Sequence, residues 1–593
     1  MKPTPTTSSK LPHRRADFAS LAEAIDYAAR GEAGLNFYSA RGELGAVLPY
    51  RELRDRAQAA ARGLIRAGLP RGTRVVMVAD TTPAFVQLFA ACQYAGLLPV
   101  PVAVPTSLGG RDAYVATLKR QIEGSAAAAA VAPEELMTYM QEAALGESLS
   151  LIATPEEVFA LPEGAAELRT WGPGEPCYLQ FSSGSTRFPK GIDIPQRALM
   201  ANCHAIAVDG LDFRPGDRAA SWLPLYHDMG LVGFMLVPLT NQFSCDYLTT
   251  RDFARRPMMW PTLIAMNQAT FSYSPTFGYD LCSRRVSEGK LTLPSIDLKS
   301  WRAAGIGGDM IQPHVLDRFA AAFAPVGFDR RAFVPSYGMA EATLAMSFSP
   351  LNKGMLTDAV SRHAMASEGR AVPAAVAADP ADTRRFVRCG RPLVGHELQV
   401  RDPEGRPLPD RAIGRIFFRG PSLMTGYYRL PDETARVLDA DGWLETGDLG
   451  YLLAGEIVIT GRSKDLIIIA GRNIWPQDLE WTVEETLELR RGDTAAFSIE
   501  TDDGEAVALL IQCRVTQPAE REALAREATS LLQRAHGVEC RVVLIPPHGI
   551  PQTSSGKISR AKAKANLLAG VYALAAGPEG AGPVGRAATA TRA

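Results

Sequence analysis

The stretch FSSGSTRFPKG, from Phe181 to Gly191, carries three serines, a threonine, two glycines and two cations within eleven residues. It follows an apolar run, Cys177 to Phe181, and precedes the alternation Ile192-Asp193-Ile194, so the pattern predicts a loop between two strands. Glycines let the backbone approach a ligand closely, which leaves amide N–H groups and hydroxyls free to bind phosphate oxygens. An ordinary polar hairpin loop is the alternative. A Walker A loop does not fit, because the spacing G-x-x-x-x-G-K-[ST] is absent.

The composition is that of a globular protein with more than one domain. The 593 residues exceed what a single hydrophobic core normally supports, so we expect two or more domains. Hydrophobic residues make up 46% and charged residues 21% of the chain, and the net charge is −1. Because nucleic-acid binding needs strongly basic stretches, which this sequence lacks, we expect no nucleic-acid partner.

Three further features predict a cytoplasmic protein. No uninterrupted apolar run reaches the roughly 18 residues that a membrane span needs. The N-terminus is polar from Thr4 to Lys10 and lacks the apolar core of a signal peptide. The eight cysteines are scattered without a C-x-x-C pair, which favours reduced thiols over a disulfide framework or a zinc site.

The first third of the chain alternates between helical and strand patterns after about 15 residues that we expect to be disordered. Apolar positions at helical spacing predict helices over 19–30, 50–67 and 83–95. Short apolar runs predict strands over 75–78, 97–104 and 126–130. Strands and helices in this order are typical of α/β architecture with parallel pairing.

The rest of the chain predicts a change of architecture towards the C-terminus. A helix (196–208) and a strand (218–223) lead into the loop LPLYHDMGL, and further α/β units follow to Gly308. Residues 350–385 have little periodicity and are interpreted as an inserted, mostly surface segment, and 394–459 has the short β-runs of a β-rich subdomain. Beyond 461–465, a strand (466–469), a helix from Gln477, a hairpin at 502–504 and a helix (519–535) predict a compact α+β domain.

Six motifs together resemble the adenylate-forming (acyl-activating) superfamily, and within it the fatty-acyl-AMP ligases. In chain order they are YLQFSSGSTRFPKGI, LPLYHDMGL, PSYGMAEATL, LETGDLGY, GRSKDLIIIAGRNIWPQDLE and SSGKISR. The resemblance runs from about residue 20 to 570, and it implies an α/β fold with a large N-terminal adenylation domain (16–461) and a small mobile C-terminal domain (462–570). Residues 571–593 are expected to form a flexible tail, rich in Gly, Ala and Pro.

The resemblance implies a reaction in two halves with ATP and Mg²⁺. A carboxylate attacks the α-phosphate of ATP, pyrophosphate leaves, and the acyl group of the acyl-adenylate then passes to a thiol. The loop would hold the β- and γ-phosphates through Ser182, Ser183, Gly184, Ser185, Thr186 and Lys190. Thr186 and Glu341, in YGMAE, match the positions that order Mg²⁺, a hard ion that few protein ligands hold.

Other matched positions would bind the nucleoside. Tyr337 corresponds to the adenine-stacking ring and is followed by Gly338 and Met339. Gly307 and Gly308 match the glycines beneath the adenine, whereas Asp309 replaces the glutamate more usual in the family. Asp448, in TGD, would accept hydrogen bonds from both ribose hydroxyls, and Arg462 would approach the ribose or phosphate.

Lys557, in SSGKISR, is the strongest catalytic candidate, because a flexible stem with a point charge can contact the carboxylate and the α-phosphate together. Lys464, in GRSKD, matches the hinge about which the C-terminal domain turns, while its neighbour Asp465 is expected to tether the local strand. His227 would border the carboxylate and the α-phosphate.

The acyl substrate and the acceptor depend on other features. Arg187, the pair His227-Asp228 and the 350–385 segment are most like fatty-acyl-AMP ligases, in which the insert restrains the C-terminal domain and CoA is rejected. Apolar residues could line an acyl tunnel or belong to the core: Met229, Leu231, Phe234, Met235, Phe277 and Met310.

The expected function is activation of a long-chain fatty acid and transfer to the phosphopantetheine thiol of an acyl carrier protein, a separate chain. An acyl-CoA synthetase is the first alternative, since it shares the catalytic residues. A non-catalytic nucleotide-binding protein and an amino-acid adenylation domain are weaker ones. Chain length, carrier, pathway and oligomeric state stay open.

Overall fold

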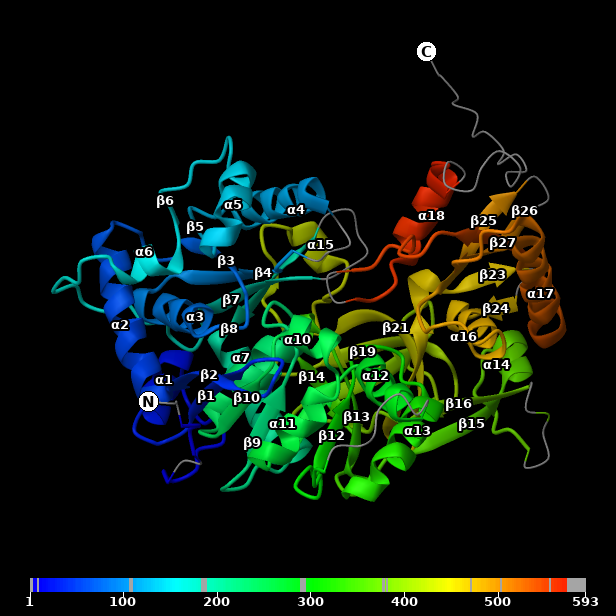
Figure 1. Ribbon diagram of the computed structural model, residues 1–593, viewed down its shortest axis with the longest axis horizontal. Helices are drawn as coiled ribbons and strands as arrows, with labels where there is room; N and C mark the ends of the chain where they lie inside the picture. Colours follow the sequence, from blue (N-terminus) through cyan, green and yellow to red (C-terminus); the bar gives the residue numbers. More distant parts are fainter. Residues whose placement is uncertain are drawn as a thin grey trace, which may run out of the picture.

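A computed structural model describes residues 4–7, 10–105, 110–182, 189–287, 295–375, 379, 382–469, 472–501, 504–553 and 556–572. The fold is α/β with a large N-terminal region and a small C-terminal one, as expected (Figure 1). Within the described ranges, every helix is too short or too polar to cross a bilayer.

A nine-stranded sheet forms the centre of the N-terminal region, in the order β17-β14-β13-β12-β11-β9-β10-β1-β2. The strands β1, β10, β9, β11, β12 and β13 pair in parallel, so their carboxyl ends share one edge of the sheet. Ligands of open α/β sheets bind at this edge. The bounds are β1 (Gly34–Tyr38), β2 (Leu44–Pro49), β9 (Arg218–Ser221), β10 (Ser244–Tyr247), β11 (Phe271–Ser274), β12 (Ala303–Ile306), β13 (Phe333–Gly338), β14 (Ala345–Phe348) and β17 (Arg391–Pro392).

A second, parallel sheet has the order β4-β3-β5-β6 and confirms the βαβ prediction for the first third of the chain. Its strands are β3 (Arg74–Val78), β4 (Leu98–Val102), β5 (Ala129–Val131) and β6 (Leu151–Ala153). Between β3 and β4 lies α3 (Pro83–Ala95), which begins at the cap Thr82 and ends at Gly96, whose φ of 66° suits glycine.

The helices that cover these sheets follow the predicted amphipathic segments closely. The predicted helix at 50–67, for example, is α2 (Tyr50–Arg66), which buries Leu53, Ala57 and Leu64. The other helices of this region are α1 (Leu21–Ala28), α4 (Gly110–Ser125), α5 (Met137–Ala143), α6 (Pro155–Phe159), α7 (Gln196–Ala205), α8 (Asp228–Gly230), α9 (Val237–Thr240), α10 (Thr250–Arg255), α11 (Met259–Asn267), α12 (Thr276–Ser287), α13 (Pro313–Phe323) and α15 (Pro431–Ala435).

The opening glycine-serine stretch joins two antiparallel strands, β7 (Pro176–Phe181) and β8 (Gly191–Pro195), and β20 (Gly426–Tyr427) pairs with β8. The strand–loop–strand prediction is therefore confirmed. Residues 183–188 lie outside the described part of the chain.

The β-rich subdomain is an antiparallel sheet with the order β18-β19-β21-β22. Its strands are β18 (Glu397–Arg401), β19 (Gly414–Arg419), β21 (Leu444–Leu453) and β22 (Glu456–Arg462). The 350–385 segment has more regular structure than its weak periodicity suggests. It contains β15 (Thr357–Ser361) and α14 (Arg362–Glu368) and the start of β16 (Thr383–Val387), and Val360 and Met365 are buried beside Trp475.

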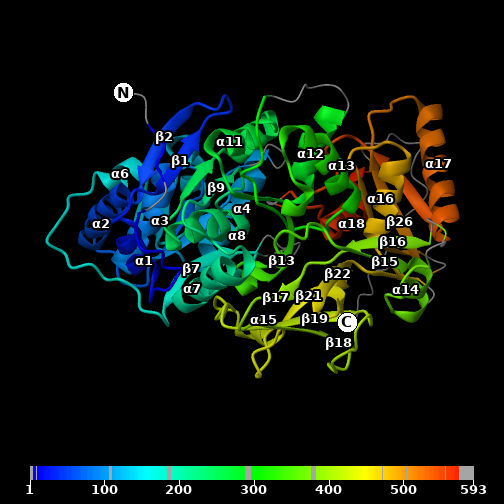
Figure 2. The same cartoon turned by 90° about the horizontal axis from the view of Figure 1, so that it is seen from below.

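The C-terminal region has hydrophobic clusters of its own, which extend from Ile467 to Tyr572. It contains β23 (Ile467–Ile469), β24 (Arg472–Ile474), α16 (Pro476–Thr486), β25 (Thr494–Thr501), β26 (Gly504–Gln512), α17 (Pro518–His536), β27 (Cys540–Ile545) and α18 (Arg560–Leu568). Both views place the hairpin β15–β16 and α14 beside this region (Figures 1 and 2).

The expected disorder of the first 15 residues is wrong for the described part, 4–7 and 10–15. The Thr6 side chain is buried, and Asn36 Oδ1 accepts its backbone N–H at 2.9 Å. A ring nitrogen of His13 lies 3.0 Å from the carbonyl of Asn241. These polar contacts to β1 and to the residue after α9, which composition does not reveal, hold the segment in place. Residues 573–593, most of the expected tail, lie outside the described ranges.

Candidate active site

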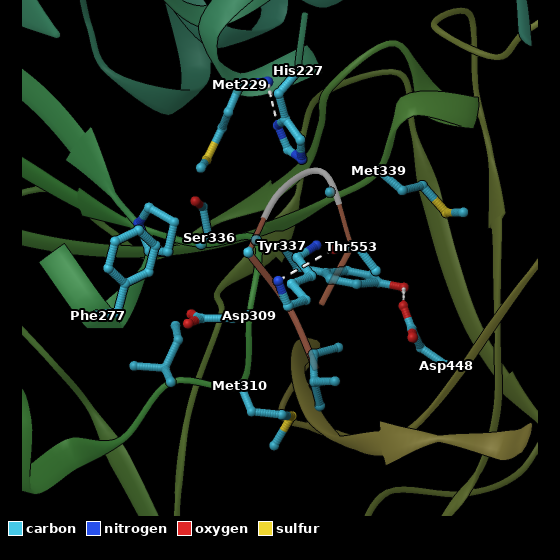
Figure 3. Close-up of a pocket in the computed structure, with 18 of the residues that line it drawn as sticks. His227, Met229, Phe277, Asp309, Met310, Ser336, Tyr337, Met339, Asp448 and Thr553 are labelled. Carbon is cyan, nitrogen blue, oxygen red and sulfur yellow. Dashed lines mark hydrogen bonds between the residues drawn. The ribbon is translucent and has the colours of Figure 1, made fainter. Parts of the chain in front are cut away.

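A cavity of about 1490 Å³ lies at the carboxyl edge of the nine-stranded sheet, beneath the C-terminal region. It brings together residues predicted from distant motifs: Ser182, Lys190, His227, Gly307, Gly308, Tyr337, Gly338, Met339, Glu341, Asp448, Arg462, Lys464 and Lys557. Ser183, Gly184, Ser185 and Thr186 lie outside the described residues. Figure 3 shows how several of the lining side chains converge.

Tyr337 and Asp448 are joined by a hydrogen bond within the cavity. Tyr337 stands at the end of β13, and its hydroxyl donates to Asp448 Oδ2 at 2.7 Å (Figure 3). Arg462 Nε lies 3.4 Å from the other carboxylate oxygen, because Asp448 and Arg462 are cross-strand partners in β21 and β22. Glycine is required beside the ring, since a Cβ on Gly338 would overlap the carbonyl of Leu344.

The glycine pair after β12 exposes backbone at the same edge. Gly308 has a φ of 82°, which glycine adopts without strain. Asp309, which follows, accepts the backbone N–H and the hydroxyl of Thr276 at 3.2 and 3.0 Å through Oδ1. Its Oδ2 accepts from Arg491 Nη2 at 3.0 Å, a contact that joins the two regions. Asp309 therefore has a structural partner on each side of the cavity.

Lys557 lies in the cavity and forms two backbone hydrogen bonds with Thr553. Thr553 donates its N–H to the Lys557 carbonyl at 2.8 Å, and Thr553 Oγ1 accepts the Lys557 N–H at 3.2 Å. Burial, followed by the nearby charge of Arg462, lowers the pKa of the Lys557 ammonium, whereas Asp228, Asp309 and Asp448 oppose this shift. The ammonium thus lies among carboxylates from the N-terminal region, and an anionic ligand would stabilise its charge.

His227 caps α8, and the neighbouring Asp228 sets its orientation. His227 Nδ1 lies 2.6 Å from Asp228 Oδ1, which also accepts the Met229 N–H at 2.7 Å. Burial alone would raise the pKa of Asp228, but His227 and Lys557 hold it below its ordinary value. A carboxylate at Nδ1 leaves Nε2 as the ring atom free to contact a ligand.

A chain of contacts connects Lys190 to Glu341. Lys190 Nζ lies 2.7 Å from Glu433 Oε2 and 4.5 Å from the centre of the Tyr427 ring. The Tyr427 hydroxyl donates to Glu341 Oε1 at 3.0 Å. Glu341 is partly buried in the cavity wall, and this burial raises the pKa of its carboxyl. A cation beside it would offset that effect.

The segment after β22 is anchored to the C-terminal region. Asp465 Oδ2 pairs with Arg560 Nη1 at 3.0 Å, and Arg560 Nη2 lies 2.6 Å from Glu480 on α16. Burial, and then the charge of Arg462, lowers the pKa of Lys464. Asp465 thus contacts a residue nearly one hundred positions away, beyond the local strand that we expected it to tether.

One arm of the cavity is apolar. Of the six candidate tunnel residues, Met229, Phe234, Phe277 and Met310 line the cavity, while Leu231 and Met235 are buried in the surrounding core. Further apolar side chains extend the arm: Ile206, Leu211, Val237, Phe271, Leu344 and Phe348.

Residues 36–428 match the family described as AMP-binding enzyme, which is well over half of the chain. The chain belongs to the AMP-binding enzyme family. A Caulobacter vibrioides protein provisionally named an acyl-CoA synthetase is 51% identical over 96% of this chain and 98% of its own. A medium-chain-fatty-acid–[acyl-carrier-protein] ligase of Moorena producens is 30% identical over 96% of both chains. A solved structure from a study of fatty acyl-adenylate ligases of E. coli and L. pneumophila is 44% identical, with a TM-score of 0.90, over 95% of this chain and 100% of that one.

Several residues that contact the site of this AMP-binding enzyme were not predicted from the sequence. Tyr427, Glu433, Arg491 and Arg560 each contact a candidate site residue or the segment after β22. Tyr427 and Glu433 lie in a stretch without a recognised motif, and Arg491 is one of two arginines in a loop. Arg560 alone had a signal, because it ends the motif SSGKISR.

Proposed function

We propose that this AMP-binding enzyme activates a long-chain fatty acid with ATP and transfers the acyl group to the phosphopantetheine thiol of an acyl carrier protein. The observation that carries the proposal is the position of Lys557. Its ammonium lies in the same cavity as the Tyr337–Asp448 pair, and an apolar arm opens from that cavity. A nucleotide, a carboxylate and an alkyl chain each have a matching surface there.

In the first half-reaction, an oxygen of the fatty carboxylate attacks the α-phosphorus of ATP, and the bond to the β-phosphate breaks. Pyrophosphate leaves with the bonding electron pair. Tyr337 would stack on the adenine, and Asp448, oriented by the Tyr337 hydroxyl and Arg462, would accept the ribose hydroxyls. Lys557 would stabilise the negative charge that builds up around phosphorus.

Lys190 and the glycine-serine loop would hold the departing pyrophosphate. Lys190 is now paired with Glu433, so phosphate oxygens would replace a carboxylate as its partner. Gly307, Gly308, Gly338 and Met339 would border the nucleotide. His227 would contact the carboxylate or the α-phosphate through Nε2.

Magnesium fits beside Glu341. The carboxyl is partly buried, its pKa is raised by that burial, and the Tyr427 hydroxyl donates to its Oε1. A divalent cation would keep it ionised, and Thr186 would be a second oxygen near the same ion. Magnesium typically takes one or two protein carboxylates together with substrate phosphates. The bound ion would neutralise part of the negative charge on the phosphates of ATP.

In the second half-reaction, the thiol sulfur attacks the acyl carbonyl, the bond to AMP breaks, and the thiol proton passes to solvent. The 350–385 segment supports a carrier protein as the acceptor. Arg384, at the start of β16, places Nη1 2.7 Å from Asp478 Oδ2 on α16, and Arg362 of α14 lies 3.1 Å from the same oxygen. Arg384 is only 3% exposed. This buried contact supports a C-terminal region whose movement is restrained, as in fatty-acyl-AMP ligases.

The remaining expectations belong to the same proposal. The N-terminal and C-terminal domains would meet at residues 461–462, with Lys464 as the hinge, and the enzyme would work in the cytoplasm. The separate hydrophobic clusters beyond Ile467 support that boundary.

A CoA-dependent acyl-CoA synthetase is the second candidate. The provisional name of the Caulobacter vibrioides relative favours it, and the name of the Moorena producens relative favours a carrier protein.

The test is incubation with ATP, Mg²⁺ and a series of fatty acids, with CoA and a holo carrier protein compared as acceptors. We expect pyrophosphate release, acyl-adenylate and an acylated carrier protein. Thioester formation with CoA alone would favour the second candidate, and absence of adenylate would exclude both.

A further inference from the structure

An arginine-rich surface lies beside the mouth of the cavity. Three of its residues, Arg251, Arg255 and Arg256, are exposed on and just after the short helix α10. A fourth, Arg285, is exposed on α12 and also lines the cavity. We call these four residues the mouth arginines.

Two contacts place α10 next to α12. Trp222 stacks on Phe253 of α10 with ring centres 3.8 Å apart, and it meets Phe277 of α12 edge-on at 5.4 Å. The Cys282 thiol donates to the carbonyl of Pro257 at 3.5 Å. Pro257 follows Arg256 directly, and Arg285 lies one turn beyond Cys282 on the same side of α12. The mouth arginines therefore lie on two segments that meet at Pro257 and Cys282.

The charge of this surface is largely uncompensated. Among the described residues, no carboxylate pairs with any of the four mouth arginines. Asp280 on α12 forms its ion pairs with Arg284 and Arg318, which are not mouth arginines. On α10, Asp252 is the one acidic residue beside Arg251 and Arg255. Arg251 and Arg255, at i and i+4, project from one face of the helix. Protein surfaces with one sign of charge attract partners of the opposite sign and accelerate their association.

The cavity continues from the reaction centre to this surface. The cavity lining includes Lys557 and Asp309 of the reaction centre and also Leu281, Arg284 and Arg285 of α12 and Trp481, Glu484 and Arg491 of the C-terminal region. A thiol on a long flexible arm could reach the acyl-adenylate along this passage while the body that carries the arm stays outside. The mouth arginines lie where such a body would rest.

We propose that the mouth arginines are the docking surface for the acidic face of a thiol-bearing carrier protein, an inference that rests on the proposed function. The partner is a protein rather than the diphosphate of CoA because of the shape of the surface. Arg251, Arg255 and Arg256 are exposed on the outside of a helix and are not part of the cavity lining. A small diphosphate is bound by converging groups in a concavity, whereas an acidic helix can span such a convex row.

The test compares two triple variants with the same change of charge. Arg251→Glu/Arg255→Glu/Arg256→Glu reverses the docking surface, and Arg30→Glu/Arg66→Glu/Arg197→Glu reverses three exposed arginines elsewhere on the N-terminal region. The acceptor is a holo acyl carrier protein whose surface around the phosphopantetheine serine is acidic. We expect the first triple variant to raise the KM for this carrier at least tenfold, with kcat within about twofold, and the control to leave KM unchanged.

Two further measurements separate docking from chemistry. ATP–pyrophosphate exchange with the fatty acid, and transfer to free pantetheine, should be equal in both triple variants and in the wild type. The KM for the carrier should rise with salt in the wild type and in the control, but not in the surface variant. An equal KM in the two triple variants, or a raised KM for CoA or pantetheine in the surface variant, would overturn the docking surface. A wild-type enzyme that forms adenylate and acylates only CoA would instead contradict the proposed function.

Arg251→Ala/Arg255→Ala/Arg256→Ala provides a second form of the test with a smaller change of charge. It should raise the KM for the carrier by a smaller factor and leave exchange intact. If the alanine variant catalyses ATP–pyrophosphate exchange at the wild-type rate and its KM for the carrier equals that of the wild type, the assignment of the docking surface is wrong. This outcome is decisive even where the glutamate variant misfolds.

Discussion

Arg491 and Asp309 form an ion pair across the cavity, with Nη2 of the arginine 3.0 Å from Oδ2 of the aspartate. The two side chains are 19% and 17% exposed. Arg491 belongs to the C-terminal region, and Asp309 is fixed to the first residue of α12 by two hydrogen bonds from Thr276. The pair therefore connects the region that carries Lys557 to a fixed point of the N-terminal region. The pair is present in the arrangement that places Lys557 in the cavity.

Replacement of Arg491 by alanine should slow adenylation about tenfold, because a largely buried carboxylate loses its partner and the arrangement with Lys557 in the cavity is less favoured. Transfer of an acyl group from acyl-adenylate supplied to the enzyme should not slow, because that step does not need the pair. ATP–pyrophosphate exchange and single-turnover transfer measure the two rates. Arg490→Ala, at an exposed neighbour, is the control. An equal loss in both half-reactions would show that Arg491 has another role.

Lys557→Ala should lower the rate of adenylation roughly 10²–10³-fold, the effect of removing one key electrostatic donor.

Lys557→Arg gives a sharper test. Burial lowers the pKa of Lys557, so its charge is lost as pH rises through a value below that of an ordinary lysine. The wild-type kcat/KM for ATP should fall at alkaline pH, and this limb should be absent in the arginine variant, which stays charged. A pH profile of pyrophosphate exchange from pH 6 to about 10.5 measures both, and an identical alkaline limb in the two proteins would contradict the assignment.

The sequence motifs assigned residues that are far apart in the chain to one site, and the structure brings those of the described ranges together in one cavity. Tyr337 and Asp448 were assigned to one nucleoside site from two separate motifs, and they are hydrogen-bonded. Tyr337 ends β13 of the parallel sheet, whereas Asp448 lies on β21 of the antiparallel sheet, so the family resemblance, and no strand pattern, assigned the two to one site. The helix bounds were also close, since capping residues such as Thr82 and Gly96 are local signals.

The contacts between the two regions were not predictable. Arg384 and Asp478 are 94 residues apart, and neither lies at a position where periodicity or a local motif indicates pairing. The weak periodicity of the 350–385 segment hid the hairpin and helix, because its buried face packs against Trp475 and Tyr451 from other parts of the chain. Such pairings depend on the docked arrangement of two regions, which no local pattern encodes.

Arg384→Met should relax the contact between the 350–385 segment and α16. The methionine keeps apolar contact with Phe386 and Trp475, but Asp478 loses its nearest cation. If this contact restrains the C-terminal region, thioester formation with CoA should increase at least tenfold, while pyrophosphate exchange changes less than about threefold.

The neighbouring Arg385 supplies the control for that experiment. It is half exposed and lies 3.6 Å from Asp317 on α13. Arg385→Ala should leave both CoA transfer and exchange at wild-type levels. If the two variants behave alike, the buried pair does not control the choice of acceptor.

Glu484, on α16, should make the stability of the C-terminal region depend on pH. Burial, and then the charge of Glu480, raises the pKa of Glu484 to about 8 from an ordinary value of 4.5. The folded protein therefore keeps a proton between pH 4.5 and 8 that the unfolded chain releases, so the free energy of unfolding falls as pH rises through this range.

Glu484→Gln cannot ionise, and Oε1 can still accept from Gly492 and Thr494. The variant should match the wild type near pH 4.5 and exceed its stability by on the order of 2–4 kcal/mol at pH 9. Thermal denaturation at both pH values, with Glu485→Gln as the exposed control, measures the difference. A stability gap that is the same at pH 4.5 and pH 9 would show that Glu484 is already ionised in the folded protein.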